Sequence, residues 1–174
     1  KFSRGFKSGG FDASDGMGSS QPYLSEDVSA WEGGLKWEAS RTFNLNLTGF
    51  YSRFNNLQSQ TYNGSAFITT NAARASTRGA EAEFRWRPAR PLTLAGAVTY
   101  IDAHYDDYRN ASCTTGQSAA WSAAGNSGAC TQDLSGRPLM DAPKWSASLN
   151  AAVQQPLASG WLASLNAGTN IRSA

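Results

Sequence analysis

The sequence predicts an all-β fold: an antiparallel up-and-down meander of about seven strands that is part of a larger transmembrane β-barrel. Two observations lead to this fold class. Apolar and polar residues alternate along six segments of the chain, so each predicted strand has one apolar face. The connections between these segments are alternately short and long, which is the layout of strands that cross a membrane back and forth.

The alternation is present in each segment. In chain order, the apolar phase consists of Trp31, Gly33, Leu35 and Trp37 around 28–38; Phe43, Leu45, Leu47 and Tyr51 in the next segment; Ala80, Ala82, Phe84 and Trp86 in 78–87; Leu92, Leu94, Val98 and Tyr100 after it; Trp145, Ala147, Leu149, Ala151 and Val153 further on; and Trp161, Ala163, Leu165 and Ala167 in 161–172. Polar and small residues predominate in the opposite phase, with Leu162 as a defect in the last segment. A strand that crosses lipid keeps such a phase over about 9–11 residues.

Alternation alone also fits a water-soluble β-sandwich, whose strands bury one face. Two features favour the barrel. Several alternations extend to about ten residues, whereas strands of soluble domains average about 5–6. Large aromatic residues also gather at both strand ends, where the two membrane–water boundaries would lie: Trp37, Phe43, Trp86 and Trp161 beside the short turns, and Trp31, Tyr51, Tyr100 and Trp145 at the opposite ends.

The connections assign the two sides of the membrane. Ala39–Thr42, Pro88–Pro91 and Gln155–Gly160 are compact and contain turn residues, so we place them on the periplasmic side. The links at about 7–27, 56–76 and 103–143 are long and polar, and we expect irregular loops that face the exterior. No apolar run is long enough for a membrane helix, and the net charge of +2 says little about partners.

Both cysteines fall in the longest polar loop. We expect Cys113 and Cys130 to form a disulfide, which closes a loop of about 18 residues and contributes about 3 kcal/mol in the loop-entropy model. Exposed loops of outer-membrane proteins fold in an oxidising compartment, which favours this pairing over two free thiols. A metal site is less favoured because the spacing is not CxxC and His104 is the sole histidine.

Two polar clusters could suggest chemistry. Asp102, His104, Asp106 and Asp107, with Tyr105 and Tyr108, could form a metal or acid–base site, but we favour a strand leaving the membrane, where tyrosines anchor the rim and carboxylates meet water. Glu81, Glu83, Arg85 and Arg87 could contain a catalytic carboxylate pair, but cross-strand charge pairing on a wet inner wall explains them better.

No credible nucleophile accompanies these clusters, because one histidine and no GxSxG pattern are present. We therefore expect no enzyme, no catalytic residue, no cofactor and no metal site. Trp121 is the best single candidate for contacting a ligand, since an exposed aromatic ring can stack on sugars or chelate rings. Packing inside the loop is the favoured alternative for this side chain.

Several segments together resemble one family. Arg4-Gly-Phe-Lys-Ser-Gly-Gly-Phe11 and Trp31-Glu-Gly-Gly-Leu-Lys36 are similar to a succession in the barrel of TonB-dependent outer-membrane receptors. The likeness continues in Phe50-Tyr-Ser-Arg-Phe-Asn-Asn-Leu-Gln58, Thr70-Asn-Ala-Ala73, Arg78-Gly-Ala-Glu-Ala-Glu83, Leu92-Thr-Leu94, Tyr100-Ile-Asp-Ala-His-Tyr105, Leu134-Ser-Gly-Arg-Pro-Leu139 and Ala142-Pro-Lys-Trp145. Each motif is modest, but their order is specific, and the resemblance covers nearly the entire chain.

The resemblance implies energised uptake across the outer membrane of a Gram-negative bacterium. Such receptors hold an N-terminal plug with a TonB box inside a 22-stranded barrel whose loops capture scarce nutrients. The chain shows no plug, TonB box or closing strand, so we expect 1–174 to be a partial barrel domain. The implied partners are outer-membrane lipid, the rest of the receptor, TonB through the plug, and a small-molecule cargo such as a ferric siderophore, with no nucleic acid.

A second function class is compatible with the residues. The chain could be a soluble or surface-displayed β-sandwich that binds glycans or acts as an adhesin, with Trp121 and the long loops forming its site. The two classes differ in where the leucines of the apolar phase lie. A barrel exposes Leu35, Leu45, Leu94 and Leu149 to lipid, whereas a sandwich buries them between two layers.

Overall fold

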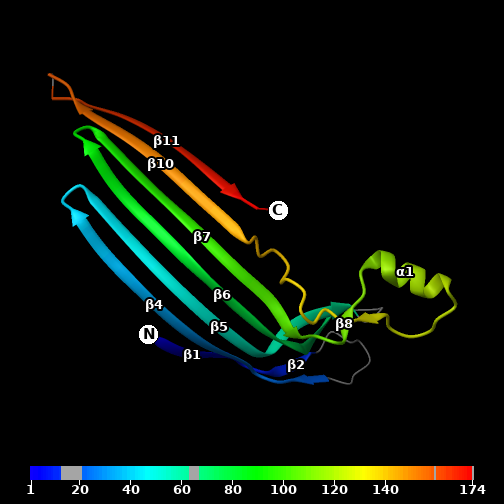
Figure 1. Cartoon of the computed structure of the whole chain (residues 1–174). Helices are drawn as coiled ribbons and strands as arrows, with labels where there is room; N and C mark the ends of the chain where they lie inside the picture. Colours follow the sequence, from blue (N-terminus) through cyan, green and yellow to red (C-terminus); the bar gives the residue numbers. More distant parts are fainter. Residues whose placement is uncertain (13–20, 63–66, 159, 174) are drawn as a thin grey trace.

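A computed structural model describes residues 1–12, 21–62, 67–158 and 160–173 and consists mainly of one antiparallel sheet (Figure 1). Neighbouring strands follow the order β1-β4-β5-β6-β7-β10-β11, so consecutive long strands pair as in a meander. The bounds are β1 Phe2–Lys7, β4 Glu26–Ser40, β5 Phe43–Tyr62, β6 Phe67–Ala89, β7 Leu92–Asp107, β10 Trp145–Pro156 and β11 Leu162–Arg172. The predicted fold class of about seven antiparallel strands is confirmed.

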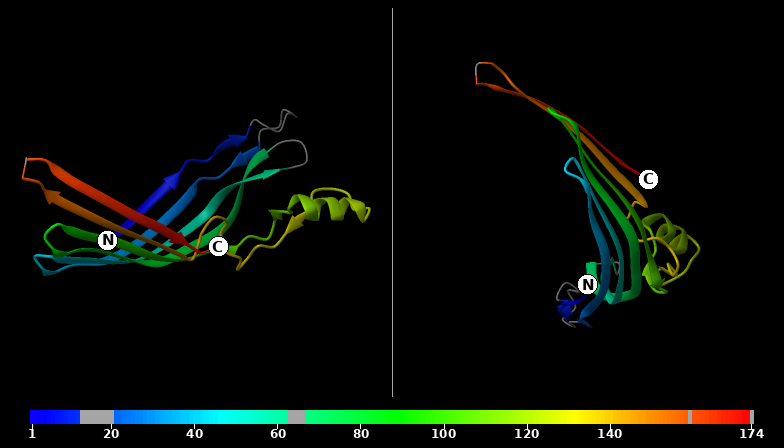
Figure 2. Two further views of the ribbon diagram at one scale, coloured as in Figure 1. Left: turned by 90° about the horizontal axis from the view of Figure 1, so that it is seen from above. Right: turned by 60° about the vertical axis from the view of Figure 1, so that its left-hand side comes forward.

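The sheet is a single curved layer (Figure 2). The two other sheets in the described part of the chain have only two strands each, and the edge strands β1 and β11 of the large sheet do not pair with each other. Leu35 is 60% exposed and Leu149 is 48% exposed, so these leucines are not held between layers. The β-sandwich alternative is therefore wrong. Among the described helices, none has the length and hydropathy needed to cross a membrane.

Strand register places the apolar phase of every strand on one face, which we call the outward face. Leu35 of β4 pairs with Leu47 of β5, which pairs with Ala82 of β6, and the same row continues through Val98 of β7 to Ala147 of β10. The neighbouring row on the other side of the sheet, the inward face, consists of Lys36, Asn46, Glu83, Ala97 and Ser148. The register thus confirms the predicted phase, because each row has one chemical character.

Aromatic side chains lie at both ends of the outward face. Phe43 pairs directly with Trp86 beside the short turns. At the opposite end Trp31 contacts Tyr51 with ring centroids 5.6 Å apart, and Tyr100 contacts Trp145 at 4.8 Å. The two predicted aromatic belts are therefore present, and the residues between them on the outward face of β4, β5 and β6 are aliphatic or small, apart from Phe84.

The short turns agree with the sequence, whereas the long links differ in part. Strand β4 ends at Ser40 and β5 begins at Phe43, and β6 ends at Ala89 and β7 begins at Leu92. The irregular loop expected at 56–76 is wrong in its described part, because β5 continues to Tyr62 and β6 starts at Phe67. A bulge with Asn56 at a positive φ of 52° marks where this extension of the hairpin begins.

The link between β1 and β4 contains a small hairpin that is attached to the extension of β5 and β6. Strand β2, Gly10–Asp12, pairs with β3, Gln21–Tyr23. The side-chain amide of Gln58 donates to the Leu24 carbonyl at 3.1 Å, and that of Asn71 donates to the same carbonyl at 2.9 Å. These two amides fix the base of the hairpin against the long strands.

The link between β7 and β10 also contains ordered structure that the sequence analysis did not predict. Helix α1, Thr115–Ala123, lies between the short strands β8, Ala111–Ser112, and β9, Thr131–Gln132. Thr114 caps the helix: its hydroxyl accepts from the Gln117 backbone, and the Gln117 side chain accepts from the Thr114 backbone. This reciprocal capping box satisfies donors at the start of the helix.

Candidate functional site

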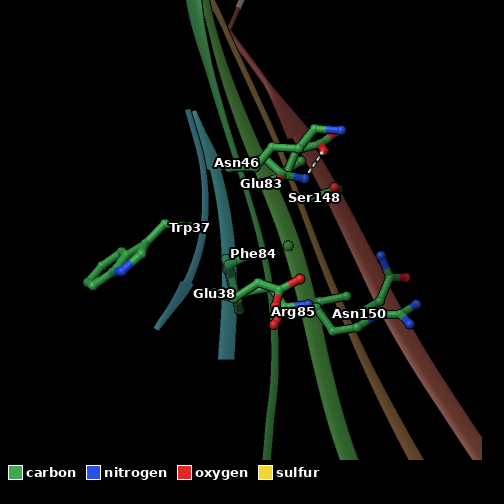
Figure 3. Close-up of a pocket in the computed structure, with 13 residues that line it drawn as sticks. Trp37, Glu38, Asn46, Glu83, Phe84, Arg85, Ser148 and Asn150 are labelled. Atoms are coloured by element: carbon green, nitrogen blue, oxygen red, sulfur yellow. Dashed lines mark hydrogen bonds between the residues drawn. The ribbon is translucent and has the colours of Figure 1, made fainter. Parts of the chain in front are cut away.

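The inward face near the short turns is a polar wall. It surrounds a hollow of about 500 Å³ whose lining includes Lys36, Asn46, Glu83, Arg85 and Asn150. Figure 3 shows Asn46, Glu83, Arg85 and Asn150 on one side of the strands, while Trp37 points away from them. Such a surface suits water and polar groups, in contrast to the outward face of the same strands.

The charges on this wall are not paired as the sequence suggested. Within the described residues, none of Glu81, Glu83, Arg85 and Arg87 takes part in a salt bridge. The side-chain amide of Asn46 donates to Glu83 at 3.4 Å across the β5–β6 pair. The expected cross-strand charge pairing is therefore wrong, and the wall keeps charged groups that are accessible to water or to another part of the protein.

Towards the long loops, large apolar residues lie on the same inward face among polar and small ones such as Glu32 and Ser52. Register places Phe50 beside Gly79 and Ile101. Four residues further along β5, beyond the inward row that contains Ser52, register places Val28, Phe54 and Tyr105 in one inward row. We call Val28, Phe50, Phe54, Ile101 and Tyr105 the inner apolar patch. Ala75, which pairs with both Phe54 and Tyr105, is fully buried by this arrangement.

Sequence reasoning missed this patch. A signal was present, because Phe50 and Phe54 occupy the phase of Asn46 and Thr48 on β5, where a simple wet wall would carry polar residues. Gly79 makes room for the Phe50 ring: a Cβ at position 79 would lie 2.6 Å from that ring. A glycine beside a large aromatic ring on a strand indicates that the ring lies flat over the neighbouring backbone.

A small core joins the long loop to the sheet. Tyr108 is 6% exposed and packs with Ala73 and Ala111, and Tyr105 and Leu134 contact this cluster. The rings of Tyr105 and Tyr108 are 5.0 Å apart. The expectation that these tyrosines anchor a membrane rim is therefore wrong, since they hold the base of the loop. Burial raises the pKa of Tyr105 above its ordinary value.

The loop beyond this core contains both remaining candidates. Cys113 and Cys130 are joined in a disulfide with their Cα atoms 5.4 Å apart, which closes the segment that contains α1. Trp121 lies on α1, is 39% exposed, and its helix has no buried residue. Figure 1 shows α1 projecting beyond the end of the sheet, so the structure does not bring Trp121 onto the inner apolar patch.

The cluster of carboxylates and His104 lies on the outward side of β7, beyond the aromatic belt. Arg78 donates two hydrogen bonds to Asp102, at 2.8 and 3.0 Å, and thereby lowers the pKa of that carboxyl. The Ser76 hydroxyl donates to Asp106 at 2.8 Å and lies 3.3 Å from Nε2 of His104. Because Ser76 gives its proton to a carboxylate, the arrangement does not present an activated nucleophile.

The chain is similar in sequence to a known receptor family and in fold to a solved receptor. A family model described as TonB dependent receptor-like, beta-barrel matches residues 1–173. The crystal structure of the ferric yersiniabactin uptake receptor FyuA from Yersinia pestis superimposes with a TM-score of 0.69 at 17% sequence identity, covering 98% of this chain and 22% of that receptor. The chain thus spans about a fifth of the length of that receptor. No curated protein sequence matches the chain.

Proposed function

The chain belongs to the family of TonB-dependent receptor β-barrels, and we propose that it forms part of an outer-membrane receptor that takes up a scarce nutrient in a Gram-negative bacterium. In this proposal residues 1–174 are a partial barrel that the rest of the receptor completes. The other strands close the barrel, a plug fills it, and TonB acts through that plug. Outer-membrane lipid covers the outward face.

The observation that carries the proposal is the division of the inward face. Its polar wall lies beside the periplasmic turns, where it suits water and a polar plug, and the inner apolar patch lies beside the exterior loops. Binding sites for small molecules combine apolar contact with a few polar groups, and that combination lies where cargo would enter. The half-buried Phe50 and Phe54 therefore form the proposed contact surface for cargo.

We favour a siderophore-type iron chelate as the cargo. The receptor of similar fold is described as a ferric yersiniabactin uptake receptor, which makes iron chelates the first class to test. A ferric siderophore has organic rings or chains around a polar centre, and aromatic side chains such as Phe54 can pack on them. Trp121 is a second proposed contact, since α1 presents its ring at the exterior end of the molecule.

Equilibrium binding to the purified receptor tests this proposal. Quenching of tryptophan fluorescence is measured with a panel of ferric catecholate, hydroxamate and phenolate siderophores, and with cobalamin and a maltooligosaccharide for comparison. Phe54→Ala should weaken binding of the recognised chelate by about tenfold, the usual cost of removing a central aromatic contact. The matched control is Phe43→Ala, because Phe43 faces outward at the periplasmic end and should leave cargo affinity unchanged.

Two results would overturn the proposal. If no siderophore binds while cobalamin or the oligosaccharide does, the cargo class is wrong. If Phe54→Ala and Phe43→Ala have equal effects on affinity in receptors that are both folded, the inner apolar patch is not the contact surface. Heat-modifiable migration in gel electrophoresis establishes that each variant has a folded barrel.

A further inference from the structure

The outward face carries a row of cationic and hydroxyl side chains directly beyond its aromatic belt. On β1, β4 and β5 the belt consists of Phe2, Trp31 and Tyr51, which pair in register, with Phe2 and Trp31 centroids 5.2 Å apart. The next outward positions on the same strands, further from the membrane centre, are Arg4, Ser29 and Arg53, which also pair in register. We call these three residues the Arg-Ser-Arg row.

The spacing of this row suits a phosphate group. Adjacent strands are about 4.8 Å apart, so the two arginines flank Ser29 with about 10 Å between their backbones. The small Ser29 side chain leaves space into which both guanidinium groups can reach, and its hydroxyl adds a donor. Arginine presents its donors in a planar fork that matches phosphate oxygens.

The two arginines have no acidic partner among the residues that the structure describes. Both side chains are exposed, and the recorded salt bridges involve Arg74, Arg78 and Arg109 but neither Arg4 nor Arg53. Two carboxylates lie close to this row: Asp27 is the next outward residue on β4, and Asp106 accepts a hydrogen bond from Ser76, the residue that pairs with Arg53. Neither forms an ion pair with Arg4 or Arg53. Their positive charge is therefore available to an external anion.

On the membrane side of the aromatic belt, the outward face contains an apolar groove. Its volume is about 770 Å³, and its lining includes Gly33, Leu35, Gly49, Ala80 and Val98. A Cβ added at Gly33 would meet nothing within 4 Å, and one at Gly49 would meet only the Gly79 carbonyl at 4.0 Å. The groove is thus open space beside flat backbone, and its lining is mostly apolar.

We propose that this part of the outward face binds a phosphorylated, multiply acylated lipid of the outer leaflet. The Arg-Ser-Arg row holds the phosphate, the aromatic belt lies at the level of the glycerol or sugar headgroup, and the groove takes an acyl chain. Charge and apolar surface are arranged in the order in which such a lipid presents them from headgroup to tail. This site rests on the membrane location in the proposed function and is independent of the cargo.

Native mass spectrometry of the intact receptor in detergent tests the proposal. The probe is hexa-acylated lipid A with two phosphates, and the comparison lipids are its dephosphorylated form and phosphatidylcholine. The double variant Arg4→Gln with Arg53→Gln should reduce lipid A affinity about thirtyfold, or about fivefold for each arginine. The control removes the same charge elsewhere, in Arg87→Gln with Arg90→Gln near a short turn, and should bind as the native receptor does.

Two further measurements examine the remaining parts of the site. Gly33→Leu places a side chain in the groove at a position where a Cβ meets nothing within 4 Å, and it should weaken lipid A binding several-fold while leaving its salt dependence unchanged. In the unsubstituted receptor, raising NaCl from 50 to 500 mM should weaken lipid A binding and leave phosphatidylcholine binding unchanged. The second measurement needs no variant, so it keeps the proposal testable if a substitution prevents folding.

Three outcomes would overturn the inference. Equal affinity for lipid A and its dephosphorylated form would show that phosphate is not recognised. Equal affinity in the Arg4 and Arg53 variant and in its control would remove the Arg-Ser-Arg row from the site. Displacement of bound lipid A by millimolar inorganic phosphate alone would mean that the row takes a free anion. Cargo affinity of the same variants should be unchanged, which separates this test from that of the proposed function.

Discussion

Replacing Leu47 with arginine should destabilise the membrane-inserted barrel by about 2–4 kcal/mol. Leu47 faces outward on β5, midway between Phe43 and Tyr51 of the two aromatic belts. With a rise of about 3.3 Å per residue and a tilt of about 40°, each belt lies about 10 Å of depth from Leu47. Its cross-strand neighbours are Leu35 and Ala82, so no carboxylate on this face can pair with the new charge.

The matched control is arginine at Asn46, the preceding residue. Asn46 faces inward and hydrogen-bonds to Glu83, so a cation there meets water and a carboxylate. We expect a change within about 0.5 kcal/mol, as for an ordinary surface substitution. Reversible guanidine unfolding of the receptor in dilauroylphosphatidylcholine vesicles, followed by tryptophan fluorescence, measures both. Equal destabilisation by the two variants, or less than about 1 kcal/mol for Leu47→Arg, would refute lipid contact on the outward face.

Three further predictions concern the exterior end. Gly79→Ala should lower the free energy of unfolding by about 1–3 kcal/mol, because the methyl group would collide with the Tyr100 carbonyl oxygen and with the Phe50 ring; an unchanged free energy of unfolding would contradict this packing. Arg78→Gln should raise the pKa of Asp102. A carboxyl pKa that is lowered in the folded state adds stability that is lost as pH falls through that pKa. The variant should therefore lose less stability than the unsubstituted protein on titration from pH 6 to pH 3. Cys130→Ser should make 115–128 at least tenfold more sensitive to protease, with the sheet still resistant; equal cleavage rates would show that the disulfide does not restrain the loop.

The strands inside the membrane could be predicted because lipid imposes one chemical character on the outward face. A shift by one residue would turn Lys36, Asn46 or Thr99 outward in place of Leu35, Leu47 or Val98. Because lipid excludes such polar groups, the sequence shows this constraint as alternation. The short turns could be predicted equally well. The connections between Ser40 and Phe43 and between Ala89 and Leu92 are too short for anything but a hairpin turn.

Beyond the membrane this constraint disappears. In the extension of β5 and β6, both faces meet water or loop residues, so Gln58, Ser59 and Asn71 are polar without alternation although they lie in strands. A polar strand and a polar loop then look alike in sequence. Helix α1 was missed for a related reason: it has no buried residue and therefore no apolar periodicity, and its one clear signal was the Thr114–Gln117 capping box.

Strands β5 and β6 rise well past the lipid surface. From Tyr51 to the end of β5 at Tyr62 the chain continues for about 35 Å at the usual rise per residue, still paired with β6. In the proposed receptor, an arriving solute would meet paired strands whose backbone is already ordered. Binding to such ordered strands would cost less conformational entropy than binding to a flexible loop, which would favour tight binding of a dilute solute.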